Sequence, residues 1–446
     1  MKFMKYLIVA FVLIFVSSCA YFNTFYNAQK YYEEGVRPLQ NGGSVNKALL
    51  DKSIEKSSKI LQFHVKSEYV DDALLLIGKS YMYTGEYTKA IRKFTELLDY
   101  FPNSKFSDDA LFFMGKTYLL QGESEVAKTI FTQVIGRSKD HRIDAINECV
   151  NIMLEKNNSK EADSLINSLS DRDKKNNNIR FLSGKVKWRA GYYEEALKYL
   201  TKVKAGKLSK NAGFEYYQIM SDIYLKTNNM KKAEKSINEG IRIFQEHIMR
   251  NSLYLLKARM LVSNEKYDKA IELLEDVLAQ PGVSSKDSLI FYKGFVYETY
   301  LSDFEKALES YRAIVDIEKS SKLYPEAEVK VKSLELYISL SLDSTSENID
   351  ENIKNRFLLA EINYQNLNRV DESIAKYEAI ADSFPQTIYA PKSMFALSYI
   401  YLKDKKDTNT SVEYLKRIIY RFPNTEYSAE AEDKLKEFES ALDTLR

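Results

Sequence analysis

The chain has 446 residues, of which 45% are hydrophobic and 29% are charged, enough for two or three compact domains or for one long repeat array. Glycine and proline number only 15 and 7, so few residues are available to punctuate an all-β protein, and the composition favours helices joined by short turns. The 65 basic residues nearly balance the 63 acidic ones, which leaves no electrostatic footprint for a nucleic-acid partner.

The first residues have the pattern of an export signal. Lys2 and Lys5 supply a positive start, and an apolar run over residues 6–16 follows. A helix of that length is too short to cross a hydrocarbon core of ~30 Å, but it fits the central region of a signal peptide. We therefore expect residues 1–18 to be a signal peptide. Removing them takes away both lysines, so the formal charge falls from +2 to 0.

Small residues lead directly into a cysteine at the end of this segment. Val16-Ser17-Ser18-Cys19 resembles the bacterial lipobox. The resemblance implies that Cys19 becomes the first residue of the mature protein, thioether-linked to diacylglycerol and acylated on its amine. Several acyl chains give a durable hold on a membrane, whereas one gives only marginal binding. The residues after the cysteine, Ala20 and Tyr21, include no aspartate, which favours sorting to the outer membrane. An ordinary cleaved signal and an uncleaved anchor are the alternatives.

A repeated pair of helices is predicted from residue 72 onward. Its first copy has one apolar face on each of two helices, separated by a break at Gly85 and ended by Pro102. The second copy lies 37 residues further on, since the same offset separates Gly78 from Gly115 and Ala90 from Ala127. Small residues are needed at these positions because the two helices cross closely there. Two landmarks with one offset indicate a true repeat of the tetratricopeptide type.

Further copies of the pattern continue to the C-terminus. They begin near residues 184, 217, 254, 294, 357 and 398, and the copy at 294 has one extra residue between its helices. A degenerate copy is expected over 141–169, an extra helix over 324–342, and a first irregular hairpin over 22–63. A final amphipathic helix over 429–445 suits a capping role. The prediction is thus an all-α solenoid of about nine or ten hairpins.

Polar stretches and composition divide the chain into five segments. Residues 172–178 and 341–352 are predicted to be long loops between repeats. We expect a signal peptide over 1–18 and a tether with the first irregular hairpin over 19–66. Three groups of repeats follow, N-terminal over 67–170, central over 171–345, and C-terminal with the capping helix over 346–446.

The residues that usually carry catalysis are sparse and scattered. Only His64, His141 and His247 exist, far apart in the chain. Cys149 is the sole thiol left after modification of Cys19, and it lies on the apolar side of a helical stretch, as a small core residue would. No glycine-rich phosphate loop or metal-ligand cluster is recognisable. We therefore expect a non-enzymatic protein without cofactor, metal or small-molecule substrate.

The first helices of the repeats are the predicted contact surface. A hairpin array leaves a concave face that suits an extended segment or a helix of a partner. Apolar and basic residues stand there at positions that the repeat core does not require: Leu75, Lys79, Met82, Tyr83, Phe112, Lys116, Leu119 and Leu120. Two interpretations remain open. These residues bind a partner, or they pack against the N-terminal segment of the same chain.

A family resemblance narrows the choice of partner. The start of the mature chain, Cys19-Ala20-Tyr21-Phe22-Asn23-Thr24-Phe25-Tyr26-Asn27-Ala28, resembles that of outer-membrane lipoproteins related to BamD, of the β-barrel assembly machinery. The linkers Phe101-Pro102-Asn103-Ser104, Phe384-Pro385-Gln386-Thr387 and Phe422-Pro423-Asn424-Thr425 resemble that family too. The usual members carry about half as many repeats. The resemblance implies a periplasmic scaffold that binds the barrel-forming assembly protein and unfolded barrel strands. The alternative is an envelope scaffold for peptidoglycan, cell-division or secretion complexes, of the type associated with the Tol–Pal system.

Overall fold

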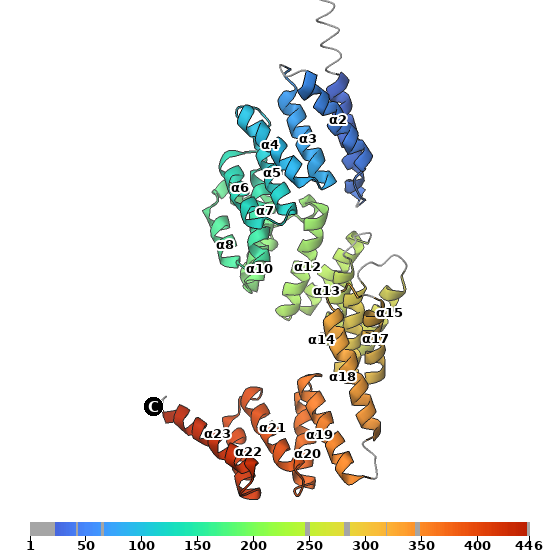
Figure 1. Cartoon of the computed structure of the whole chain (residues 1–446), viewed down its shortest axis with the longest axis vertical. Helices are drawn as coiled ribbons and strands as arrows, with labels where there is room; N and C mark the ends of the chain where they lie inside the picture. The colour runs from blue at the N-terminus through green and yellow to red at the C-terminus, as the bar shows by residue number, and fades with distance from the viewer. Residues whose placement is uncertain are drawn as a thin grey trace, which may run out of the picture. The chain divides into compact units, whose positions relative to one another are not determined.

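The computed structural model describes residues 23–41, 43–63, 67–245, 250–280, 286–317, 319–343 and 348–443. Throughout these ranges the regular structure is helical and no strand is formed (Figure 1), so the predicted all-α class is confirmed for them. The predicted signal peptide and Cys19 lie outside the described residues.

The chain folds as two compact units that meet in sequence between Ile219 and Met220, inside α12 (Lys210–Lys226). The first unit starts with a helix over residues 23–36 and a short 3-10 helix, η1 (Arg37–Asn41). Its following helices are α2 (Lys47–Phe63), α3 (Val70–Thr84), α4 (Tyr87–Tyr100), α5 (Ser107–Leu120), α6 (Ser124–Arg137), α7 (Arg142–Glu155), α8 (Ser159–Ser168), α9 (Asp171–Lys174), α10 (Asn177–Arg189), α11 (Tyr193–Leu200) and η2 (Ala205–Lys207).

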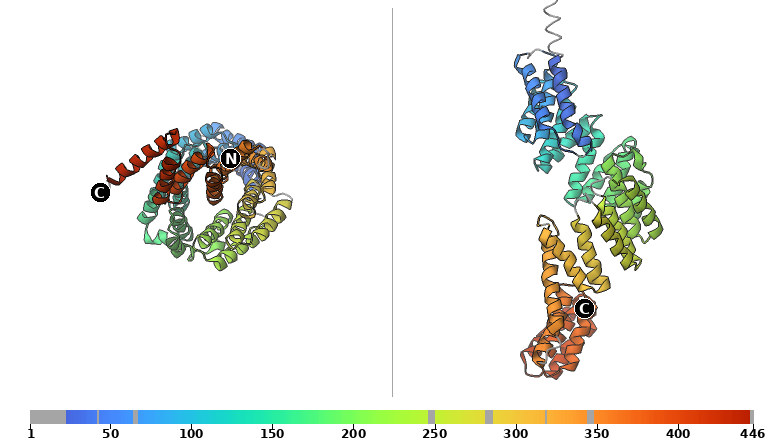
Figure 2. Two further views of the ribbon diagram at one scale, coloured as in Figure 1. Left: turned by 90° about the horizontal axis from the view of Figure 1, so that it is seen from below. Right: turned by 90° about the vertical axis from the view of Figure 1, so that its right-hand side faces the viewer.

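The second unit continues the same arrangement of paired helices, which Figure 2 shows from two further sides. Its helices are α13 (Met230–Ile243), α14 (Asn251–Ser263), α15 (Tyr267–Ala279), α16 (Asp287–Val296), η3 (Tyr297–Leu301), α17 (Phe304–Ile317), α18 (Tyr324–Asp343), α19 (Ile349–Gln365), α20 (Val370–Ser383), α21 (Tyr389–Lys403), α22 (Thr408–Arg421) and α23 (Glu426–Asp443).

Close helix crossing explains the glycine and alanine landmarks of the repeat. A Cβ atom placed on Gly78 would lie 2.5 Å from the ring of Phe94, and one on Gly115 would lie 2.8 Å from the ring of Phe131. Both phenylalanines are fully buried. Only a residue without a side chain fits under these rings, because a well-packed core has no spare volume. The sequence landmarks are therefore the contact points between the two helices of each hairpin.

Left-handed residues make the turns between paired helices. Gly85, Gly122 and Gly191 have φ values of 84°, 91° and 82°, a conformation that glycine adopts without steric cost. In other repeats an asparagine takes this place, as at Asn157 and Asn228 with φ of 57° and 54°. The degenerate copy predicted over 141–169 is thus a complete hairpin, α7 and α8, whose turn lacks the glycine signal.

The number of helices exceeds the sequence-based count. The described residues contain 23 helices, more than nine or ten hairpins comprise, so the predicted number of repeats was too small. The four-residue helix α9 lies where a continuous loop over 172–178 was predicted. The extra helix predicted over 324–342 is confirmed as α18. The extra residue in the repeat near 294 is absorbed by η3, a π-helical turn that ends at left-handed Ser302.

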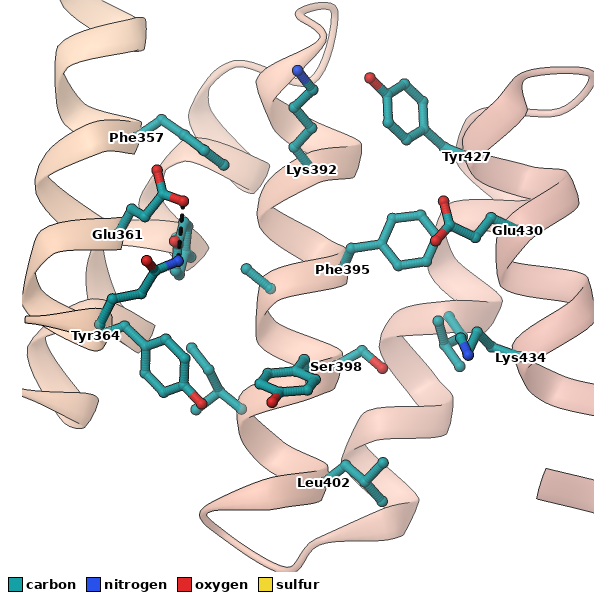
Figure 3. Close-up of a pocket in the computed structure, with 16 residues that line it drawn as sticks. Phe357, Glu361, Tyr364, Lys392, Phe395, Ser398, Leu402, Tyr427, Glu430 and Lys434 are labelled. Atoms are coloured by element: carbon teal, nitrogen blue, oxygen red, sulfur yellow. Dashed lines mark hydrogen bonds between the residues drawn. The ribbon is translucent and has the colours of Figure 1, made fainter. Parts of the chain in front are cut away.

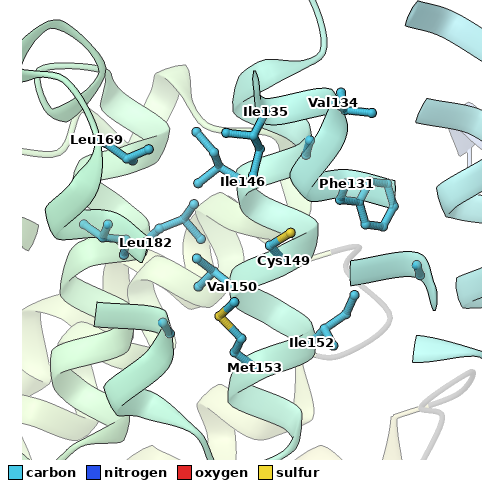
Figure 4. Close-up of a cluster of buried hydrophobic side chains, with 14 of the residues drawn as sticks. Phe131, Val134, Ile135, Ile146, Cys149, Val150, Ile152, Met153, Leu169 and Leu182 are labelled. Atoms are coloured by element: carbon cyan, nitrogen blue, oxygen red, sulfur yellow. The ribbon is translucent and has the colours of Figure 1, made fainter. Parts of the chain in front are cut away.

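Cys149 lies in the apolar core of the first unit (Figure 4), as predicted. It is fully buried on α7, in one cluster with Phe131, Ile146 and Leu182. Burial raises the pKa of its thiol to about 11, so the thiol stays protonated at neutral pH. Cys149 is therefore a packing residue.

Candidate functional site

Three of the eight predicted contact residues are interior side chains. Leu75, Met82 and Phe112 expose only 8%, 3% and 6% of their surface. Leu75 and Met82 belong to the apolar cluster around Phe94, and Phe112 to the cluster that contains Cys149. The expectation that these three side chains lie on an open face was wrong, because neighbouring helices of the same chain cover them.

Two others contact the N-terminal helix over residues 23–36. The rings of Tyr83 and Tyr32 have centroids 6.3 Å apart, and the Lys79 ammonium lies 4.9 Å from the ring centroid of Tyr32. Intramolecular packing, the alternative interpretation, therefore accounts for Lys79 and Tyr83. Lys116 and Leu119 are half-buried, and Leu120 is 53% exposed. Partner binding at these last three positions stays a prediction.

A row of lysines recurs on the first helices of the first unit. Lys79, Lys116 and Lys185 each follow the glycine at which a hairpin crosses, so they recur on the same side of α3, α5 and α10. Each faces a carboxylate on the next first helix. The Nζ–Oε1 distance is 4.0 Å from Lys116 to Glu148 and 2.7 Å from Lys185 to Glu215.

The partner of Lys79 in this lysine–carboxylate ladder is Asp109 on α5. Burial lowers the pKa of Lys79, and the negative charge of Asp109 opposes that shift. Burial also raises the pKa of Glu148 in the next pair. His141 Nε2 lies 3.0 Å from Asp109 Oδ1, and its ring stacks on Phe112 with centroids 4.5 Å apart. The charges on this face are therefore matched within the chain. The sequence signal that could have revealed this ladder is the lysine that follows each of the three glycines.

The second unit holds a groove of about 540 Å³ that the sequence analysis did not single out (Figure 3). It runs over three successive first helices, α19, α21 and α23, and we call it the C-terminal groove. Its lining residues are Phe357, Glu361, Tyr364, Gln365, Tyr377, Lys392, Phe395, Ala396, Ser398, Tyr399, Ile400, Leu402, Leu415, Tyr427, Glu430 and Lys434. A volume of this size is in the range of ligand-binding clefts.

Helical periodicity places these side chains on one face of each helix. Spacings of three and four residues join Phe357, Glu361 and Tyr364 on α19, and the same spacings recur on α21 and α23. Phe395, near the middle of α21, stands between the α19 and α23 walls in Figure 3. Tyr399 is 51% exposed, so aromatic surface is open to solvent.

The floor of the groove is apolar, and the Ser398 hydroxyl is bonded within the chain. Tyr377, Ile400 and Leu415 are at least 97% buried. The Ser398 hydroxyl lies 2.9 Å from that of Ser411, and burial raises the pKa of the Tyr377 phenol. A ligand therefore meets a hydrophobic floor, and its polar groups are recognised only at the walls.

Aromatic pairs form those walls. The rings of Tyr364 and Tyr399 meet edge to face with centroids 6.3 Å apart, and those of Phe395 and Tyr427 are 6.4 Å apart. The Tyr364 hydroxyl donates a hydrogen bond of 2.7 Å to Asp404 Oδ2. Such pairs fix the orientation of large rings, so the walls are rigid and expose π-faces and edges to a partner.

Two family models of helical repeats match the chain. The model described as the SusR N-terminal TPR domain matches residues 157–324, and a tetratricopeptide repeat model matches residues 72–104 and 392–425. The chain contains tetratricopeptide repeats. The match over 392–425 includes α22 and most of α21, so it covers the centre of the C-terminal groove. Tetratricopeptide repeats generally mediate protein–protein interaction and typically have no catalytic activity, and no catalytic family matches.

Solved structures show distant likenesses, while no curated protein sequence matches the chain. A tetratricopeptide repeat protein from Parabacteroides merdae is 15% identical, with 59% of this chain and 98% of that chain covered and a TM-score of 0.45. Pseudomonas aeruginosa pilF is 12% identical, covering 51% and 97%, with a TM-score of 0.38. Human IFIT1 is 13% identical, with 89% of this chain and 100% of that chain covered and a TM-score of 0.41. These likenesses are too weak to carry an argument.

The part of the chain that the structure describes contains neither a metal-ligand cluster nor a helix suited to span a membrane. Within it, no three His, Cys, Asp or Glu side chains gather as a metal site would require. No helix in these residues combines the length and apolarity needed to cross a bilayer. Lys330 and Glu298 form an ion pair of 2.7 Å. The Tyr311 hydroxyl donates a hydrogen bond to Glu298, and Lys330 donates one to the backbone oxygen of Asn366. These charges therefore serve the packing of α16–α19.

Proposed function

We propose that the protein is a lipid-anchored scaffold on the periplasmic face of the outer membrane, where it holds segments of other proteins in the C-terminal groove. The observation that carries the proposal is the aromatic lining contributed by three successive first helices. Large rings in a partly exposed groove supply contact area at low entropic cost, and such positions dominate the binding energy of protein interfaces.

The proposed location rests on the N-terminal sequence. The lipobox-like Val16-Ser17-Ser18-Cys19 supports lipid attachment through Cys19, and Ala20 and Tyr21 support the outer membrane as the destination. The test is mass spectrometry of the mature N-terminus, compared with a Cys19→Ala variant. A mature Cys19 that carries diacylglycerol on its sulfur and a further acyl chain on its amine is expected. An unmodified leader retained on the mature protein contradicts the proposed anchor.

The proposed partner follows from the resemblance to BamD-like lipoproteins. In this role the scaffold binds the barrel-forming assembly protein, and unfolded outer-membrane proteins as they arrive. The resemblance is carried by the residues after Cys19 and by the three Phe-Pro linkers, two of which, Phe384-Pro385 and Phe422-Pro423, precede α21 and α23. The groove and the motif-bearing linkers therefore belong to the same repeats.

Photo-crosslinking in intact cells tests both the partner and the site. A photoreactive phenylalanine analogue replaces Tyr399 in the groove, and a matched control carries it at Tyr420 on α22, which is 87% exposed and outside the lining. Adducts with a barrel-assembly protein are expected from position 399 and not from position 420. Equal adducts from both positions, or none from 399, contradict the proposed use of the groove.

Depletion of the protein separates this role from the second candidate, an envelope scaffold for peptidoglycan, division or secretion complexes. General loss of barrel proteins from the outer membrane supports the assembly role. Chaining or altered cell shape with normal barrel-protein levels supports the second candidate instead.

A further inference from the structure

Carboxylates border the aromatic rings of the C-terminal groove on every wall. Glu361 lies on α19, Glu430 on α23, and Asp404 directly follows α21 (Figure 3 shows the first two on opposite sides of Phe395). Neutral groups donate to two of them: Gln365 Nε2 to Glu361 at 3.1 Å, and the Tyr364 hydroxyl to Asp404. None of the three forms an ion pair within the described residues.

Within the described residues, neither of the two lysines that line the groove forms an ion pair with a lining carboxylate. Lys434 Nζ forms a 3.0 Å ion pair with Glu437, one turn further along α23. Lys392 Nζ lies 5.8 Å from the ring centroid of Tyr389, which is not a lining residue. Both side chains are exposed, so solvent screens them further. Lys434 also attracts Glu430, which is itself exposed, and Lys403 and Lys405 attract Asp404. Half-buried Glu361, which forms no ion pair within the described residues, is therefore the carboxylate of the lining that remains open to a partner's cation.

Aromatic faces next to carboxylates attract a cation. Lys403 already places its ammonium 5.2 Å from the ring centroid of Tyr399, an example within the chain. The other five rings of the lining, Phe357, Tyr364, Tyr377, Phe395 and Tyr427, carry no cation from the described residues. A planar cation could stack on such a ring while donating hydrogen bonds to a neighbouring carboxylate.

We propose that the C-terminal groove recognises an arginine side chain flanked by apolar residues in a segment of its protein partner. The guanidinium combines stacking on aromatic rings with paired hydrogen bonds to a carboxylate, which an ammonium cannot reproduce. The flanking apolar residues cover the hydrophobic floor at Tyr377, Ile400 and Leu415. An acidic segment would place like charges beside Glu361 and Glu430 and is rejected. The inference rests on the proposed function of the groove as a protein-binding site.

Peptide binding to the full-length protein in detergent tests the inference. The probe is a fluorescein-labelled peptide, Gly-Ser-Leu-Arg-Leu-Ser-Gly, compared with versions that have Lys, Gln or Glu in place of Arg, and binding is followed by fluorescence anisotropy. We expect the Arg peptide to bind about tenfold more tightly than the Gln peptide, since one charged hydrogen bond is lost, and the Lys peptide to fall between them. Equal affinities for the Arg, Gln and Glu peptides overturn the inference.

Charge-matched variants locate the site. Glu361→Gln with Glu430→Gln removes two carboxylates from the groove, whereas Glu432→Gln with Asp433→Asn removes two from exposed positions of α23 that do not line it. We expect the first pair of substitutions to lower the affinity for the Arg peptide about tenfold and the second pair to lower it less than about twofold. The helical circular dichroism signal should be unchanged in both variants. Equal losses in the two pairs overturn the inference.

The two proposals fail in different experiments. Adducts from position 399 in cells, together with no preference for the Arg peptide, keep the scaffold function and remove only the recognition of arginine. Absence of adducts from position 399 removes the proposed function, whatever the peptides show.

Discussion

Replacing Gly78 by alanine tests the close crossing of α3 and α4, because the new methyl group would lie 2.5 Å from Cε1 of Phe94. Phe94 is fully buried and cannot move into solvent. Over-packing of this kind costs about 1–3 kcal/mol, and the better helix propensity of alanine returns up to about 1 kcal/mol. We expect a net loss of about 1–2 kcal/mol in the free energy of unfolding.

The control is the same substitution at Gly136. A Cβ there meets no atom within 4 Å, and the residue lies exposed near the end of α6. Gly136→Ala is therefore expected to stabilise the first unit by about 0.5 kcal/mol. One chemical change thus has opposite signs at two helical glycines of the same unit.

Trp188, the single tryptophan, lies on α10 in the first unit and reports its unfolding selectively. Tryptophan fluorescence in urea should show the midpoint of Gly78→Ala lowered by about 0.5–1 M and that of Gly136→Ala slightly raised. Adding Phe94→Leu to Gly78→Ala should cost less than the sum of the two single changes, since the smaller side chain makes room. Shifts of both glycine variants in the same direction would refute this explanation of the repeat landmarks.

Three further predictions concern polar groups that are buried or half-buried. Lys330→Met leaves Glu298, which is 1% exposed, without its cation, and should lower the free energy of unfolding in denaturant by about 3 kcal/mol. Adding Glu298→Gln should recover part of that loss. An unchanged free energy of unfolding for Lys330→Met contradicts the pairing. Cys149 should react with a maleimide only after urea unfolds the first unit, whereas rapid labelling of the native protein contradicts its burial. Burial, and to a lesser extent the negative charge of Asp71, raises the pKa of Asp72 from 3.8 to about 6. Because the folded state favours the protonated carboxyl, the contribution of Asp72 to stability is present below about pH 4 and is lost as the pH rises to about 6. Asp72→Asn should flatten that pH dependence of the urea midpoint, and an unchanged slope would count against it.

The hairpins were predictable because their crossing points need particular residues. Gly78, Gly115, Ala90 and Ala127 share one offset, and each pair of helices is held where a larger side chain would clash. The helix α9 was missed because its four residues lie in a polar stretch without apolar periodicity, which predicted a loop.

The site was less predictable than the fold. Leu75, Met82 and Phe112 looked exposed when one repeat was considered alone, yet neighbouring helices bury them. Burial between repeats depends on which helices stack and on what residues 23–36 cover, and a single repeat pattern does not contain that information. The C-terminal groove was missed for the same reason, since Tyr364, Phe395 and Tyr427 become one surface only after three first helices are placed together.

The lysine–carboxylate ladder affects how the first unit unfolds. Each pair joins consecutive repeats, so its energy belongs to an interface between repeats and vanishes when either neighbour melts. Partly exposed pairs such as Lys185–Glu215 contribute about 0.2–1 kcal/mol each, and the burial of Lys79 and Glu148 offsets part of the gain at the other two interfaces. In a one-dimensional array, strong interfaces relative to the stability of single repeats suppress fraying from the ends. The ladder thereby increases cooperativity, so that the repeats of this unit tend to be lost together and not one at a time.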